Sequence, residues 1–168
     1  SGQLGDGTTE DKHTPVQVSS ITFAEALASG QYYAAAVKFD GTVWAWGANS
    51  AGQLGDGSKA TYLVPVQVSA LTDLVSVVAG SAHTVALKAD GTVWTWGYNF
   101  YGQLGDGTTT SRGFAAAVPG LTAVQAFHRL GLDDLEAGRA FLFVVRLEDI
   151  PDREIALIFE GDVPEYMV

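Results

Sequence analysis

The sequence predicts an all-β protein: a partial β-propeller of four-stranded antiparallel blades, followed by a tail that contains a β-hairpin. Three observations lead to this prediction. The string GQLGDG occurs at residues 2–7, 52–57 and 102–107, a spacing of 50 residues. Two segments with alternating tryptophans each follow an Asp-Gly pair, as in a hairpin, and no long segment has the 3.6-residue period of a helix. A fixed period of 20 to 50 residues is typical of solenoids and propellers.

The repeat extends well beyond GQLGDG. Residues 2–51 align with 52–101 without a gap, and 23 of the 50 positions are identical. The identities gather in GQLGDG, in a Pro-Val-Gln-Val string and in Asp-Gly-Thr-Val-Trp-x-Trp-Gly. We therefore expect two full repeats and part of a third, which together occupy residues 1–126.

Each repeat has four strand-like segments. AAAVKFDGTVWAWG indicates a hairpin with Asp40-Gly41 in a two-residue type I′ turn, which needs positive φ at both residues, and Asp90-Gly91 repeats the arrangement. A Pro-led strand (Val16–Val18 and Val66–Val68) and a run such as LVSVVAG supply the other two strands. Four short strands per repeat, arranged radially, make a propeller blade.

The position of GQLGDG predicts its role. It lies between the Trp-bearing strand and the next Pro-led strand, so we expect it to be the crossing between blades, with Leu54 filling the core and its glycines in tight backbone. The oxygen-rich run Asp6–Asp11 lacks the spacing of an EF-hand loop. We expect neither a metal nor any other cofactor.

Several motifs keep both order and spacing in GSAHTVALKADGTVWTWGYNFYGQLGDG, residues 80–107. This segment resembles the regulator-of-chromosome-condensation repeat, and the resemblance covers residues 1 to about 126. The first copy departs from the pattern, with Tyr33 and Ala34 in place of His83 and Thr84. The resemblance implies a seven-bladed propeller that acts as a binding platform, and hence a protein partner.

Particular activities of that family are not expected here. One member exchanges nucleotide on a small GTPase at chromatin, but a net charge of −10 repels phosphate backbones and the repeats contain no inserted loop. A plant relative senses ultraviolet light through tryptophans that are absent from residues 30–34 and 80–84. We expect no nucleic-acid binding and, because no apolar run reaches 18 residues, no membrane insertion.

Catalytic motifs are missing from the sequence. His83 occupies the repeat's own histidine position, His13 lies in a loop, and His128 is the third histidine. No G-x-S-x-G, Walker or H-E-x-x-H string occurs. We expect a protein that is not an enzyme.

Differences between the copies point to candidate binding residues, because what the blade itself requires should occur in both. After Trp-Gly the second copy has Tyr98, Phe100 and Tyr101, where the first has alanine and serine. Exposed aromatic clusters are typical of interface hot spots, although these residues could also pack against the tail or a neighbouring blade. Gln31-Tyr32 aligns with Ser81-Ala82 of the second copy and is a second pair of candidate binding residues chosen by the same comparison.

Residues 127–168 form an acidic tail that carries ten acidic against four basic residues. A hairpin of 141–147 with 154–160 is predicted there, either in place of the third blade's Trp-bearing hairpin or as a separate unit. One interpretation makes the repeats a scaffold for protein recognition. A second makes the tail a catalytic or inhibitory unit, and a third makes the repeats structural parts of a large surface or secreted protein.

Two blades and part of a third cannot close a seven-membered ring. Either further blades extend a longer chain, several copies form a homo-oligomer, or the tail caps the open end; a truncated product is a further alternative. The absence of an initiator Met favours the longer chain. The acidic, cysteine-free composition suggests a bacterial source and leaves the compartment open.

Overall fold

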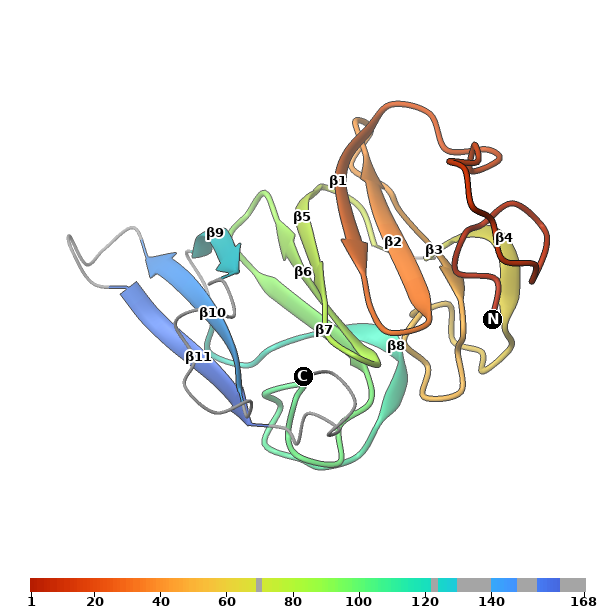
Figure 1. Ribbon diagram of the computed structural model, residues 1–168. Coiled ribbons are helices and arrows are strands. Elements are labelled where there is room, and N and C mark those ends of the chain that lie inside the picture. The colour runs from red at the N-terminus through yellow and green to blue at the C-terminus, as the bar shows by residue number, and fades with distance from the viewer. Residues whose placement is uncertain (69–70, 122–123, 130–139, 148–153, 161–168) are drawn as a thin grey trace.

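The computed structural model describes residues 1–68, 71–121, 124–129, 140–147 and 154–160, and beyond Val124 it describes the backbone alone. Three antiparallel sheets follow one another along the molecule (Figure 1). Blade one has the order β1-β2-β3-β4, blade two has β5-β6-β7-β8, and the third sheet has β9-β10-β11. The prediction of an all-β protein with four-stranded antiparallel blades is confirmed. The strands are β1 (Ala24–Ser29), β2 (Tyr33–Lys38), β3 (Val43–Gly47), β4 (Tyr62–Gln67), β5 (Leu74–Ala79), β6 (His83–Lys88), β7 (Val93–Gly97), β8 (Arg112–Ala117), β9 (Val124–Arg129), β10 (Ala140–Leu147) and β11 (Glu154–Glu160).

The Asp-Gly hairpins differ from the predicted type I′ turn. Asp40 does not have positive φ; only Gly41 does, at 73°, and Lys38 accepts a bond from the Gly41 amide while its own amide donates to Thr42. This is the three-residue loop with glycine in the left-handed position. The Asp40 carboxylate accepts from the Thr42 amide at 3.0 Å, and that bond stabilises the loop.

The fourth strand of each blade comes from the following repeat. β4 pairs with β3, with Trp44 opposite Gln67, and β8 pairs with β7 in the same register. Residues 16–18, the predicted Pro-led strand of the first repeat, are not a strand. The physical reason is that their partner would be the third strand of a preceding blade, and the described residues contain none.

The prediction that GQLGDG crosses between blades is wrong. Residues 52–57 connect β3 to β4 within one sheet, and the chain passes to blade two only after β4. The string nevertheless contributes to the blade interface, because Leu54 is completely buried in the core between the blades. The Gln53 carbonyl also accepts a hydrogen bond from the Trp96 indole at 2.9 Å.

The hydrophobic core lies between the blades. Both blades contribute aliphatic residues to it, and each adds one aromatic residue, Tyr33 from blade one and Trp96 from blade two. Alternate residues of a strand point to opposite faces, so a blade must cover both faces with its neighbours. The cluster between the blades consists of Tyr33, Ala35, Val37, Val43, Ala45, Leu54, Val68, Leu71, Leu74, Val77, Ala86 and Trp96.

The tail contributes a hairpin to the third sheet. β10 and β11 pair antiparallel, with Val145 opposite Ile155, and β9 pairs with β10. β9 contacts β5 and β6, and Val124 is buried against Val85 and Leu87 of blade two. The hairpin therefore takes the place of the missing Trp-bearing hairpin. β9 runs across residue 126, and the division of the chain there remains a prediction.

Most of the acidic residues of the tail lie outside the described residues, as do the connections at 130–139 and 148–153. The same holds for the His128 side chain.

Candidate protein-binding rim

The five predicted binding residues lie along one rim of the blades, where β1 turns into β2 and where β7 leaves the sheet. The Gln31 amide donates to the Ser81 carbonyl at 3.1 Å, so the turn of blade one touches the equivalent turn of blade two. The Tyr98 amide donates to the Ala82 carbonyl at 2.9 Å. Residues 80–82 thus connect the two groups, and we call Gln31, Tyr32, Tyr98, Phe100 and Tyr101 the binding rim.

The three aromatic residues after β7 form a cluster. The ring of Tyr98 lies 5.3 Å from that of Phe100 and 6.2 Å from that of Tyr101, measured between centroids and in tilted geometry. Phe100 is 68% exposed and Tyr101 is 61% exposed, whereas Tyr98 is half-buried beneath them. Tyr32, in the neighbouring turn, is also exposed. The rim therefore presents large apolar surface to solvent.

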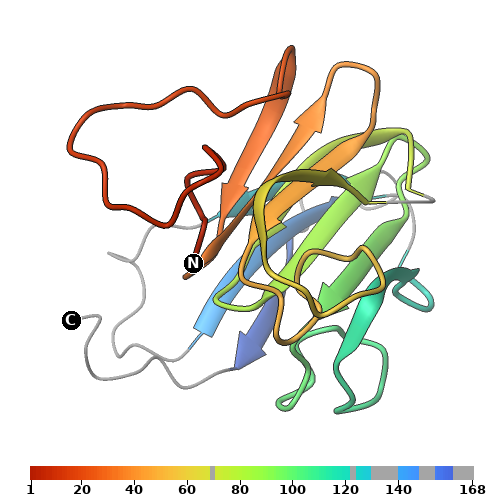
Figure 2. The same ribbon diagram turned by 90° about the vertical axis from the view of Figure 1, so that its right-hand side faces the viewer.

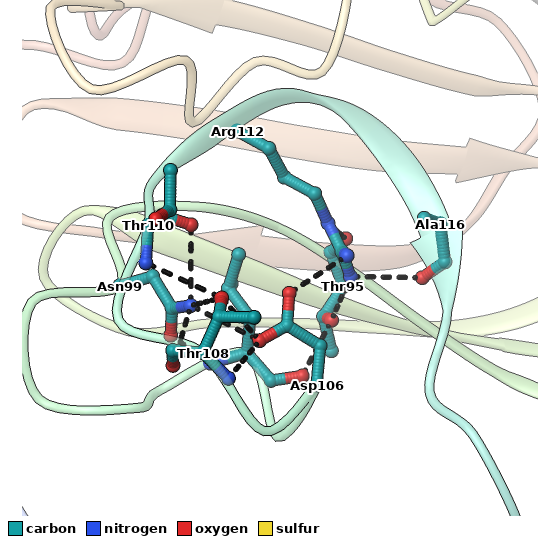
Figure 3. Close-up of polar contacts among 8 residues, drawn as sticks. Thr95, Asn99, Asp106, Thr108, Thr110, Arg112 and Ala116 are labelled. Atoms are coloured by element: carbon teal, nitrogen blue, oxygen red, sulfur yellow. Dashed lines mark hydrogen bonds and ion pairs between the residues drawn. The ribbon is translucent and has the colours of Figure 1, made fainter.

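Asn99, within this cluster, holds the loop in one conformation. Its side chain is completely buried, and its amide nitrogen donates to the carbonyls of Thr108 at 3.1 Å and Thr110 at 3.2 Å (Figure 3). Its amide oxygen accepts from the Leu104 amide at 2.8 Å. Because one side chain ties both ends of the loop together, the aromatic residues are carried on a preorganised backbone.

Arg112 on β8 adds a charged anchor. Its guanidinium lies 2.9 Å from the Asp106 carboxylate, and it also donates to the Thr95 hydroxyl at 2.9 Å and the Ala116 carbonyl at 3.3 Å (Figure 3). Burial alone would raise the pKa of Asp106, but hydrogen bonds from Thr108 and the charge of Arg112 outweigh it and lower the pKa. The carboxylate therefore stays ionised and keeps its bonds.

Blade one shows that this framework does not require the aromatic residues. Asn49 there donates to Asp56 at 3.0 Å and to the Ser58 carbonyl at 3.2 Å and accepts from the Leu54 amide at 3.0 Å, as Asn99 does with Asp106, Thr108 and Leu104. The positions beside it hold only alanine and serine. The aromatic residues are thus additional to what the loop needs for folding. Tyr62 stands in the place of Arg112 and helps to lower the pKa of Asp56.

Sequence reasoning missed two features of the molecule. The Arg112 network was one, although the replacement of Ala45 by Thr95 signalled it. The other is an exposed pair on the opposite rim, Phe23 and Phe39, whose backbones are bonded at 2.9 Å. Their counterparts in blade two are aspartate and alanine, so comparison of the copies could have found them too.

The described histidines do not form a catalytic arrangement. His83 is buried, and burial lowers its pKa to about 4, so it is neutral at physiological pH. His13 lies exposed in the N-terminal segment. In the described part of the chain, no group of three or more His, Asp or Glu side chains could hold a metal ion. A search of the same residues for a helix long and apolar enough to cross a membrane finds none.

Stacked four-stranded blades joined by loops at their rims define the class of protein: a β-propeller built from repeats. Models of the regulator of chromosome condensation (RCC1) repeat match residues 40–87 and 90–128, and a second model of this repeat matches 25–53 and 74–103. The chain belongs to the RCC1 repeat family. No curated protein matches it.

Solved structures show the same fold. Human WBSCR16 is 20% identical, with a TM-score of 0.67 over 86% of this chain and 37% of its own. Prp20p from Saccharomyces cerevisiae, described with its binding to Gsp1p and histones, is 18% identical, with a TM-score of 0.56 over 70% and 32% of the two chains. Yeast RCC1 (Prp20) bound to Kap60 is 19% identical, with a TM-score of 0.53 over 71% and 29%. The chain thus spans about a third of the length of each of these proteins.

Proposed function

We propose that this chain is a protein-recognition module, not an enzyme, and that its partner binds the binding rim. The observation that carries the proposal is the exposed aromatic cluster after β7. Its rings are held on a loop whose backbone is tied by a buried asparagine. The equivalent loop of blade one keeps that framework and lacks the rings.

Energetic reasoning supports the choice of residues. Exposed rings gain free energy when a partner covers them, and tyrosine is enriched among the residues that dominate binding. A loop that is already ordered loses little conformational entropy on binding. Gln31 and Tyr32 extend the surface onto blade one, so we propose that the partner contacts both blades.

The known partners of similar structures support a protein ligand. Prp20p is described with binding to Gsp1p and histones, and yeast RCC1 with Kap60. Those are whole proteins about three times the length of this chain, and their partners are not assigned here. We also propose that the chain joins further blades or copies of itself.

A loop exchange tests the proposal. The triple variant Tyr98→Ala, Phe100→Ser, Tyr101→Ala gives blade two the loop residues of blade one, which the same framework already accommodates. Partners captured by the wild-type chain from a cell lysate are identified, purified and titrated against wild type and variant. We expect the loop exchange to weaken binding by roughly 30-fold or more, as hot-spot residues do.

Phe39→Ala on the opposite rim is the matched control and should leave the Kd unchanged. A purified partner that binds the loop exchange as tightly as wild type would refute the assignment of the rim.

A further inference from the structure

Blade one has an uncovered face. Leu27 on β1 is 71% exposed, whereas its counterpart Val77 on β5 is 3% exposed. Leu4 is 38% exposed, and its counterpart Leu54 is completely buried. The positions are equivalent in sequence and in strand register, so the difference comes from what lies next to them.

Between the two blades these positions are covered: Val77 of blade two packs on blade one, and Leu54, in the β3–β4 connection of blade one, is enclosed between them. Val77 and Leu54 belong to the core cluster that includes Tyr33, Val37 and Val43. On blade one the corresponding space is an open groove of about 900 Å³, lined by apolar side chains from the N-terminal segment and β1. Figure 2 shows the N-terminal segment looping out beside β1. The side chains that line the groove include Val16, Val18, Ile21, Leu27 and Trp46.

The wall of the groove has the same construction as the covered interface between blades one and two. The Trp46 indole donates to the Gln3 carbonyl at 2.9 Å, as Trp96 donates to Gln53 at 2.9 Å. The N-terminal segment therefore sits on blade one as residues 52–57 sit on blade two. The two faces differ in their cover: the sheet of blade one covers the face of blade two, whereas no described residue covers the face of blade one.

The two ends of the row of sheets are also complementary in their strands. Blades one and two each take a fourth strand from the following repeat. The third sheet stops at β11 without a fourth strand among the described residues. Residues 12–17, the counterparts of β4, form no strand and pair with no sheet among the described residues. Among the described residues, residues 12–17 thus have no sheet partner, and the outer edge of β11 has no strand paired to it.

The sequence of the third sheet indicates that both of its faces are covered. β10 reads AFLFVVRL and β11 reads EIALIFE, and neither alternates apolar with polar residues. Strands with nearly continuous apolar runs are those that are covered on both faces. Blade two lies on one side of this sheet, through contacts of β9 with β5 and β6.

We propose that a second copy of this chain covers blade one, in a head-to-tail contact. The third sheet of one copy packs on the groove of the next copy, and residues 12–17 of that next copy add to β11 as its fourth strand. The contact is heterologous, so it forms a closed ring or an extended row. It is distinct from the binding rim and does not depend on the partner proposed above.

The register of the blades predicts which residues meet. Trp44 faces Gln67 across β3 and β4, and Gln17 is the counterpart of Gln67. Ile155 pairs with Val145 as Trp94 pairs with Ala86, which places Ile155 where Trp44 lies in blade one. Ile155 of one copy should therefore face Gln17 of the next.

Disulfide cross-linking of the full chain tests this register, and the natural sequence contains no cysteine that would interfere. The double variant Gln17→Cys, Ile155→Cys should form intermolecular disulfides under mild oxidation and give a ladder on a non-reducing gel. The control pair Gln17→Cys, Glu160→Cys displaces the second cysteine by about 16 Å along β11 and should react much more slowly. Equal rates for the two pairs would overturn the proposed strand addition.

Mass in solution provides the second test. Light scattering of the wild-type chain should give a multiple of 17.6 kDa, and Leu27→Glu should weaken self-association roughly tenfold or more, because a carboxylate would be buried without a partner. Val75→Glu is the matched control, since its counterpart in the first repeat is already Glu25. A monomer of 17.6 kDa up to the solubility limit would overturn the proposal and leave the groove to a partner of another sequence.

Discussion

Tyr33 of blade one donates a hydrogen bond through its hydroxyl to the carbonyl of His83, the residue that occupies its own position one repeat later. The same hydroxyl lies 2.9 Å from that of Thr84, and burial raises the pKa of the phenol. The histidine position of the repeat therefore does two things: its side chain packs within its own blade, and its backbone accepts a bond from the preceding one.

Tyr33→Phe should reduce the free energy of unfolding by about 0.5 to 1.5 kcal/mol, because the buried His83 carbonyl loses its bond from the phenol and keeps the one from the Gly80 amide. Urea unfolding followed by tryptophan fluorescence measures the change. Tyr32→Phe, in the exposed turn, is the control and should change it by less than about 0.5 kcal/mol. An equal effect of the two substitutions would contradict the role of the bond.

Gly80→Ala should destabilise the protein more than Gly57→Ala. A Cβ at Gly80 would lie 2.1 Å from the His83 ring, whereas one at Gly57 would meet nothing within 4 Å and suffer only from a φ of 84°. Backbone strain of the second kind costs about 1 kcal/mol, and forcing a buried ring aside costs more. Thermal unfolding of both variants compares the two, and a larger loss for Gly57→Ala would show that the histidine ring can move freely.

Stability should fall as the pH drops from about 6.5 to about 4. Burial lowers the pKa of His83 in the folded state to about 4, so the unfolded chain binds this proton first. The difference corresponds to roughly 3 kcal/mol once the pH reaches the lower value. Urea titrations across this range should show the decline in wild type and a much flatter profile in His83→Gln. An unchanged profile in the variant would assign the decline to the carboxylates.

A further loss should follow below pH 4. The folded-state pKa of Asp106 is lowered, so its contribution is present above the unfolded value and disappears as the pH falls through the folded one. Asp106→Asn should reduce the slope of stability against pH in that range. The same slope in wild type and variant would mean that the bonds of the Asp106 carboxylate to Thr108 and Arg112 contribute nothing.

Arg112 and Thr95 should show coupled effects on stability. Arg112→Tyr alone removes the guanidinium that donates to the Thr95 hydroxyl. Arg112→Tyr combined with Thr95→Ala gives blade two the pair that blade one has at these positions, Tyr62 and Ala45. We expect the double variant to be more stable than the sum of the single changes predicts, by roughly 0.5 to 3 kcal/mol. A double-mutant cycle measures this, and strict additivity would show that the network is two independent contacts.

The repeat made most of the blade predictable. Strand segments, the buried Leu54 and the order of the sheets follow from apolar alternation and a period of 50 residues, which are local properties of the chain. The aromatic residues of the rim could be selected by comparing the copies, because whatever differs at equivalent positions is not required by the fold.

Tertiary structure alone decided which segment pairs with which. Residues 16–18 and 66–68 have the same sequence, Val-Gln-Val, yet the second lie at the end of β4 and the first belong to no strand. Leu27 and Val77 hold equivalent apolar positions, yet one is exposed and the other buried. Sequence by itself determined what each repeat can form, whereas burial and strand pairing depend on the neighbouring sheet, since a strand's hydrogen bonds and its apolar face are satisfied only by another segment.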